Sequence, residues 1–250
     1  MTIMIWRSDI CFNRCVIGVL LLFALLKIAG AATVSGRVEL VLSHDPKVRK
    51  HTDYSGVVVW LEPASGLPVL PAAVARAQMV QKNKTFLPHV LAISVGTVVD
   101  FPNFDPIFHN AFSNYNGQIF DIGLYAPGTT KAIAFHREGA VRVFCNIHPA
   151  MSAVILVVDT PYFTVSDHDG NFEIADVTPG EYKFEVFHER AAENVLQGLE
   201  RRVTVEAETL TLPKVEISES GYLPASHQNK YGKDYSNTTE GGLTYPGAAK

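Results

Sequence analysis

The sequence has few cysteines, no excess of positive charge and no long stretch with the periodicity of an amphipathic helix. Its formal net charge is −4, which argues against nucleic acid as a partner because binding to phosphates needs a basic surface. The lack of helical periodicity argues against a helical fold. Outside the N-terminal segment, only residues 72–79 have a pattern compatible with a short helix.

The N-terminal segment has the order of parts typical of a secretory signal peptide. Arg7 and Arg14 precede the uncharged apolar run Cys15–Leu26, and the small residues 29–31 follow it. The apolar run is too short for a comfortable membrane span, so we expect cleavage after residue 31. An uncleaved membrane anchor is the alternative, because Lys27 lies between the apolar run and the cleavage site. Both predict an exported protein, most simply in a bacterial periplasm.

Cleavage would leave a chain with a single thiol. Residues 1–31 carry three basic side chains and one acidic side chain, so their removal changes the formal charge from −4 to −6 (−4 − 2). They also carry two of the 3 cysteines, and Cys145 alone remains. Since cysteines of exported proteins are normally paired or absent, this lone thiol needs a functional explanation.

Short runs rich in Val, Ile, Phe and Thr recur along the chain and are bounded by Gly, Pro, Asn and Asp. They predict an all-β fold of the sandwich or barrel type. After Thr160 the pattern restarts, with turns at 169–170 and 179–180 that are typical of a hairpin-rich module. We expect a domain over 32–160 with an N-terminal β extension, a small β-sandwich over 161–217 and a flexible tail over 218–250 that is poor in aliphatic residues.

The densest chemistry lies in a loop between two strongly β-forming runs, where Cys145, His148 and Met151 follow one another at intervals of three residues. Thiolate and thioether sulfurs are soft donors that favour copper, and imidazole suits both of its oxidation states. Two histidines, one cysteine and a weak axial methionine form the blue-copper site used for electron transfer. The loop therefore predicts three of the four ligands of one type 1 copper ion, although the same donors would also take zinc.

The fourth ligand must be a histidine from elsewhere in the chain. His109 is the best placed by sequence, because it follows the polar loop that starts at Asn103 and opens a short β-like run. His89 and His136 remain as competitors, because they also lie near predicted strands.

These residues resemble a known family. Residues 84–159 are similar to the cupredoxins, and the spacing with Pro149 directly after the second histidine is most similar to amicyanin-like members. The arrangement of the whole chain is similar to that of bacterial methylamine-utilization-like proteins. The resemblance implies a cupredoxin Greek-key sandwich in which His148 is the exposed ligand and Asn110 ties the ligand loops together by hydrogen bonds. The copper ligands that it implies are His109, Cys145, His148 and Met151.

Residues 161–217 resemble the carboxypeptidase regulatory-like, transthyretin-like sandwich, around the segments 166–172 and 179–182. The resemblance implies a noncatalytic module for docking, and related folds sometimes bind carbohydrate.

We therefore expect a copper protein that is not an enzyme and that carries single electrons between redox partner proteins. The alternative is a protein that holds copper for storage, delivery or sensing. A third hypothesis is a cysteine hydrolase that uses Cys145 as its nucleophile. The hydrolase is disfavoured because Cys145 ends a predicted strand instead of starting a helix, where thiolates are stabilised, and because Met151 would have no role in it.

Overall fold

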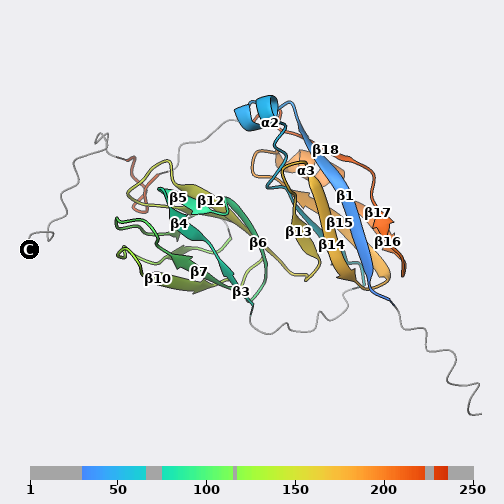
Figure 1. Ribbon diagram of the computed structural model, residues 1–250, viewed down its shortest axis with the longest axis horizontal. Coiled ribbons are helices and arrows are strands. Elements are labelled where there is room, and N and C mark those ends of the chain that lie inside the picture. The colour runs from blue at the N-terminus through green and yellow to red at the C-terminus, as the bar shows by residue number, and fades with distance from the viewer. Residues whose placement is uncertain (1–29, 66–74, 115–116, 223–227, 236–250) are drawn as a thin grey trace, which may run out of the picture. The chain divides into compact units, whose positions relative to one another are not determined.

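The structure, a computed structural model, describes residues 30–65, 75–114, 117–222 and 228–235, and these residues form mainly β-strands (Figure 1). The two helices α2 (Pro46–His51) and α3 (Glu193–Leu199) are short. The predicted all-β fold class is confirmed. Except for its last two residues, the expected signal peptide lies outside the described residues. Within the described residues, no helix is both long enough and apolar enough to cross a membrane.

The strands between residues 76 and 158 form one β-sandwich. A five-stranded sheet has the order β6-β12-β11-β8-β9, a three-stranded sheet has the order β10-β7-β3, and β4 and β5 form a hairpin. Buried side chains of these strands make a common core. The strands are β3 (Arg76–Gln78), β4 (Val80–Lys82), β5 (Thr85–Leu87), β6 (Val90–Ser94), β7 (Val98–Pro102), β8 (Phe112–Ser113), β9 (Phe120–Asp121), β10 (Thr130–Ala134), β11 (Gly139–Phe144) and β12 (Ser152–Val158).

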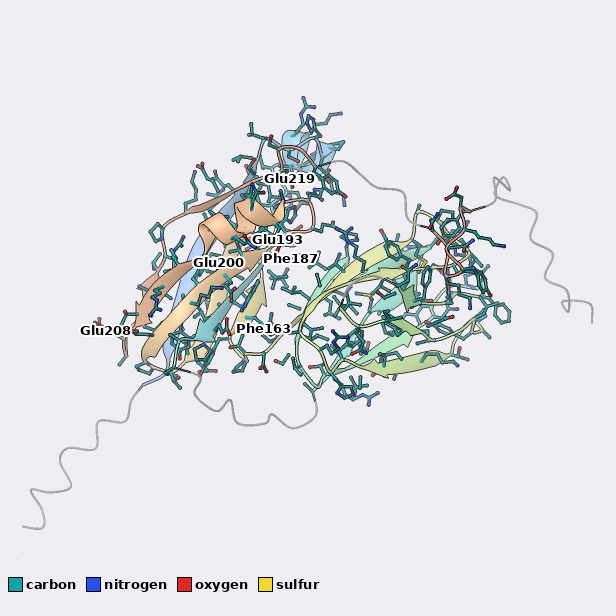
Figure 2. The ribbon with its side chains drawn as sticks, turned by 180° about the vertical axis from the view of Figure 1, so that it is seen from behind. Phe163, Phe187, Glu193, Glu200, Glu208 and Glu219 are labelled. Carbon is teal, nitrogen blue, oxygen red and sulfur yellow. The ribbon has the colours of Figure 1, made fainter. Side chains whose placement is uncertain are left out.

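Strand β12 is buried on both faces, which explains why its sequence does not alternate between polar and apolar residues. Alternate residues such as Ile155 face the core of this sandwich. Leu156 and Val158 face the other way and form a second cluster with Val58. Phe163 and Phe187, labelled in Figure 2, pack against this second cluster.

The remaining strands form a second sandwich of two four-stranded sheets. One sheet has the order β14-β1-β17 with β18 also paired to β1, and the other has the order β13-β2-β15-β16. In β15, Tyr182, Phe184 and Val186 alternate inward and fill the core between the sheets. The strands are β1 (Ala32–Val41), β2 (Val58–Pro63), β13 (Phe163–Val165), β14 (Asn171–Val177), β15 (Gly180–Phe187), β16 (Arg201–Val205), β17 (Leu210–Thr211) and β18 (Val215–Ser218).

Strand pairing crosses the division that we expected near Thr160. Strand β1 pairs with β14, and β2 lies between β13 and β15. The N-terminal strands thus complete the second sandwich and do not extend the first one. The turns at 169–170 and 179–180 connect strands of different sheets, so they do not form the expected hairpins. The alternating pattern of a sequence identifies a strand but not its partner. Near the expected short helix, the described residues 76–78 instead form β3 beside β7.

Part of the expected flexible tail is ordered by specific contacts. Glu219, labelled in Figure 2, follows β18 and is 2% exposed. Its carboxylate accepts hydrogen bonds from the side chains of Ser43, His188 and Arg190. Residues 228–235 also make hydrogen bonds, which are described below. A buried and fully paired carboxylate fixes the backbone that carries it, whatever the aliphatic content of the segment.

We expect Glu219→Gln to reduce the free energy of unfolding by about 2 kcal/mol at neutral pH, because a neutral amide accepts weaker hydrogen bonds than the buried carboxylate does. Burial alone would raise the pKa of Glu219, but hydrogen bonds from His188, Arg190 and Ser43 outweigh it and lower the pKa from 4.5 to about 2. The unfolded chain therefore takes up the proton first as the pH falls. The stabilisation is complete above pH 4.5 and is lost as the pH approaches about 2.

Urea unfolding at pH 7 and pH 3 would measure this effect. Wild-type protein should lose stability between the two pH values, and Glu219→Gln should lose less. Glu216→Gln is the matched control, since Glu216 lies three residues earlier, in β18, and its side chain is 56% exposed. Equal pH dependence of Glu219→Gln and wild-type protein would contradict the assignment.

Candidate metal centre

The loop between β11 and β12 is held in a closed conformation by the register of the two strands. Phe144 pairs with Ser152 across the antiparallel ladder, so the residues between them must turn tightly. The N–H of Cys145 donates to the carbonyl of Met151 at 3.1 Å, and the N–H of Met151 donates to the carbonyl of His148 at 2.9 Å. These two hydrogen bonds define the turn of the loop.

Three potential ligand atoms converge at this loop. Nδ1 of His148 lies 3.6 Å and Nδ1 of His109 lies 3.8 Å from Sγ of Cys145. The three ligand atoms lie within 4.8 Å of one another, and the two imidazole rings are 4.7 Å apart between centroids. His109 and Cys145 are completely buried, whereas His148 is half-buried.

These distances fit one shared metal ion. Metal bonds of about 2.3 Å to a thiolate and about 2.05 Å to an imidazole nitrogen place the two ligand atoms about 3.5 to 3.8 Å apart, for bond angles between tetrahedral and trigonal. The observed separations of 3.6 and 3.8 Å fall in this range. Met151 is 1% exposed and lies in the same buried cluster as Cys145, so a thioether is also at hand in the core beneath the loop.

Asp105 orients the first histidine. Its carboxylate lies 2.8 Å from Nε2 of His109, which leaves Nδ1 to face Cys145. The backbone N–H groups of Asn83 and Lys84, in the turn between β4 and β5, both donate to the same carboxylate. Burial alone would raise the pKa of Asp105, but these bonds and the one to His109 outweigh it and lower the pKa. A carboxylate behind a ligating imidazole is the usual arrangement in metal sites.

Asn110 links the two ligand segments. Its side-chain oxygen accepts a hydrogen bond of 2.6 Å from the N–H of Asn146, and its nitrogen lies 3.4 Å from the Asp121 carboxylate. This bond joins the segment that carries His109 to the loop that carries Cys145. Burial raises the pKa of the Cys145 thiol. Hydrogen bonds with the backbone of Asn110, Ile147 and His148 lower this pKa, but by a smaller amount. A bound cation would reverse this balance and favour the thiolate.

The two competing histidines lie outside this cluster. His89 bonds to the Glu189 carboxylate at 2.7 Å, and its side chain is 51% exposed. His136 is exposed on the segment after β10. In the part of the chain that the structure describes, His109, Cys145 and His148 are the group that could share a metal. The partner Asp105 was missed by sequence reasoning, although its position four residues before His109 is a signal that could have found it.

The chain matches one curated protein well. It is 33% identical over 81 residues to the methylamine utilization protein MauL of Methylorubrum extorquens, a match that covers 32% of this chain and 71% of MauL. No family model matches the sequence.

Two solved structures show weaker likeness. A purple cupredoxin from Nitrosopumilus maritimus is 26% identical, covers 34% of this chain and 99% of its own, and has a TM-score of 0.30. A reduced mutant form of amicyanin is 15% identical, covers 41% of this chain and 99% of its own, and has a TM-score of 0.32. TM-scores of this size do not by themselves establish a shared fold.

Proposed function

Because the chain belongs to the family of the methylamine utilization protein MauL through the 81 residues that match it, we propose that it binds copper and carries single electrons between partner proteins. The observation that carries the proposal is the approach of both imidazole Nδ1 atoms to the Cys145 sulfur, at 3.8 and 3.6 Å. With Met151 as the weak axial ligand, His109, Cys145 and His148 would form a type 1 copper site. The protein is then a carrier and not an enzyme.

The residues around the ligands keep the site nearly unchanged during electron transfer. When bound, copper would gain and lose one electron by alternating between Cu(II) and Cu(I). Asp105 holds the ring of His109, and Asn110 holds the backbone of Asn146 between the ligands of the loop. A ligand set that is fixed from outside needs little rearrangement between the two oxidation states, which is what fast electron exchange requires.

His148 is the proposed exit of the electron. It is the half-buried member of the ligand group, and the next two residues, Pro149 and Ala150, are exposed. On the segment that carries the other histidine, Pro106 is exposed and Phe108 is 41% exposed. An apolar surface of this kind beside the ligands suits transient docking of a redox partner protein with an apolar patch of its own.

The proposal includes export of the protein from the cytoplasm. The basic, apolar and small-residue segments of residues 1–31 support export, most simply to a bacterial periplasm. A membrane would be a partner only if this segment stays uncleaved.

The second sandwich, with its resemblance to the carboxypeptidase regulatory-like module over 161–217, would serve as a noncatalytic docking or carbohydrate-binding-like module. In this proposal the sandwich of residues 76–158 binds copper, and the second sandwich takes no part in binding it.

Copper storage, delivery or sensing is the second candidate, and the burial of the soft donors favours it. Cys145 is 0% exposed and Met151 is 1% exposed. A buried thiolate and thioether would retain Cu(I) against exchange with solvent ligands. Rapid and reversible electron exchange would favour the carrier, whereas binding of Cu(I) alone with release to an acceptor would favour delivery.

The test is the visible absorption and electron paramagnetic resonance spectrum of residues 32–250 after addition of Cu(II). We expect an intense blue band and the narrow hyperfine splitting of a copper thiolate site, and His109→Ala should lose both because it removes one of the two imidazole ligands. His89→Ala and His136→Ala are matched controls and should keep both features. A colourless wild-type protein, or a blue His109→Ala variant, would refute the proposed site.

A further inference from the structure

The C-terminal segment Gln228–Tyr235 lies on the ligand loop. The hydroxyl of Tyr235 donates to the carbonyl of Cys145 at 3.0 Å. The backbone N–H of Lys230 donates to the side-chain oxygen of Asn146 at 3.0 Å, and its ammonium group lies 2.8 Å from the Asp121 carboxylate. These contacts reach two successive residues of the loop, and one of those residues is the cysteine ligand itself.

The segment has a shape of its own. The N–H of Asn229 donates to the carbonyl of Lys233 at 2.8 Å, and the N–H of Gly232 donates to the carbonyl of Asn229 at 2.9 Å. The side chain of Asn229 accepts further bonds from the N–H groups of Tyr231 and Lys233. Such Asx-type bonds fix a compact turn without a strand or helix. The turn therefore presents Lys230 and Tyr235 to the loop in defined positions.

Lys230 closes a ring of four hydrogen-bonded residues. Asn146 donates from its N–H to Asn110, and Asn110 donates to Asp121. Lys230 donates from its side chain to Asp121 and from its backbone to Asn146. Without the Lys230 side chain, the second oxygen of Asp121 loses its partner, whereas Asn146 keeps the backbone N–H of residue 230. The ring thus connects the segment after the first histidine ligand, strand β9, the ligand loop and the C-terminal turn.

We propose that residues 228–235 form an intramolecular strap that holds the ligand loop closed and slows loss of the metal, with Lys230 and Tyr235 as its positioning residues. The inference about the metal rests on the proposed copper site, whereas the closure of the loop does not. Groups that orient metal ligands from outside typically contribute 10- to 100-fold to metal affinity. Tyr235 acts through the carbonyl of the cysteine ligand, and the Lys230 side chain acts through Asp121, which Asn110 joins to Asn146.

The experiment compares Tyr235→Phe and Lys230→Met with wild-type residues 32–250. In metal-free protein, amide hydrogen exchange at residues 145–151 should become about 10-fold faster in both variants. In copper-loaded protein, transfer of Cu(I) to a soluble chelator should also become about 10-fold faster. Lys230→Arg should restore wild-type rates, because a guanidinium group can also pair with Asp121.

The control lies in the same turn. Lys233→Met removes the same charge as Lys230→Met from an exposed position. It should not change the two rates. Unchanged exchange in Tyr235→Phe and Lys230→Met would overturn the strap. Faster exchange in a protein that takes up no copper would support closure of the loop and refute the copper site instead.

Discussion

Cys145→Ser is expected to lower the affinity for Cu(I) by more than about 100-fold and to remove the blue band expected with Cu(II). Cys145 is the thiolate donor of the cluster, with both imidazole nitrogens within 3.8 Å of its sulfur. Loss of a group that only orients a ligand costs 10- to 100-fold in affinity, so loss of the ligand itself should cost more. A serine hydroxyl has nearly the same size but is neither soft nor deprotonated at neutral pH.

Competition with a Cu(I) chelator would measure the affinity of both proteins. Val143→Thr is the matched control, because it also places a hydroxyl in the buried cluster around Cys145 but removes no ligand. The free energies of unfolding of the metal-free variants would show whether both keep their fold. Wild-type affinity in a folded Cys145→Ser protein would show that Cys145 is not a ligand.

Gly170→Ala is expected to destabilise the protein by more than about 3 kcal/mol. Gly170 has a φ angle of +82°, which disfavours any side chain. A Cβ atom at this position would also lie 2.1 Å from the carbonyl oxygen of Val38 in β1. The carbonyl of Gly170 accepts a hydrogen bond of 2.8 Å from the N–H of Val38, so the two backbones cannot separate without loss of this bond.

Gly96→Ala separates the two causes of this effect. Gly96 has a φ angle of +88°, and a Cβ atom there would meet no atom within 4 Å. It should therefore cost only the backbone strain, about 1 kcal/mol. Urea unfolding of both variants gives the comparison. Similar losses of stability would mean that the close approach to Val38 does not constrain the turn.

The ligand loop could be predicted from sequence because the residues that define it are close together in the chain. Three donors within seven residues, bounded by two β-forming runs, define a loop whose strands must pair across it. The structure brings His109 to this loop, and it leaves His89 and His136 outside the cluster. Assignment of the four ligands to copper stays a prediction until the metal is measured.

Strand partners and the strap could not be predicted because they depend on contacts between distant residues. The alternation in β15 identifies an inward face, but nothing in it indicates that β2 is the neighbour. The same holds for the bond between Tyr235 and Cys145, which are 90 residues apart. A polar segment that contains one tyrosine has the composition of a flexible tail. The contact of Tyr235 is recognised only when the position of the ligand loop in space is known.

The pairing of β1 with β14 has a consequence for biosynthesis. Ala32 pairs with Val177, so β1 must wait for 145 further residues (177 − 32) before its partner exists. At about 5 to 20 residues per second, this delay is on the order of 10 to 30 s. All strands from β3 to β12 emerge in the meantime. The ligand-bearing sandwich can therefore fold while β1 and β2 remain unpaired edges that invite association with other chains, so the nascent protein should benefit most from a chaperone during this interval.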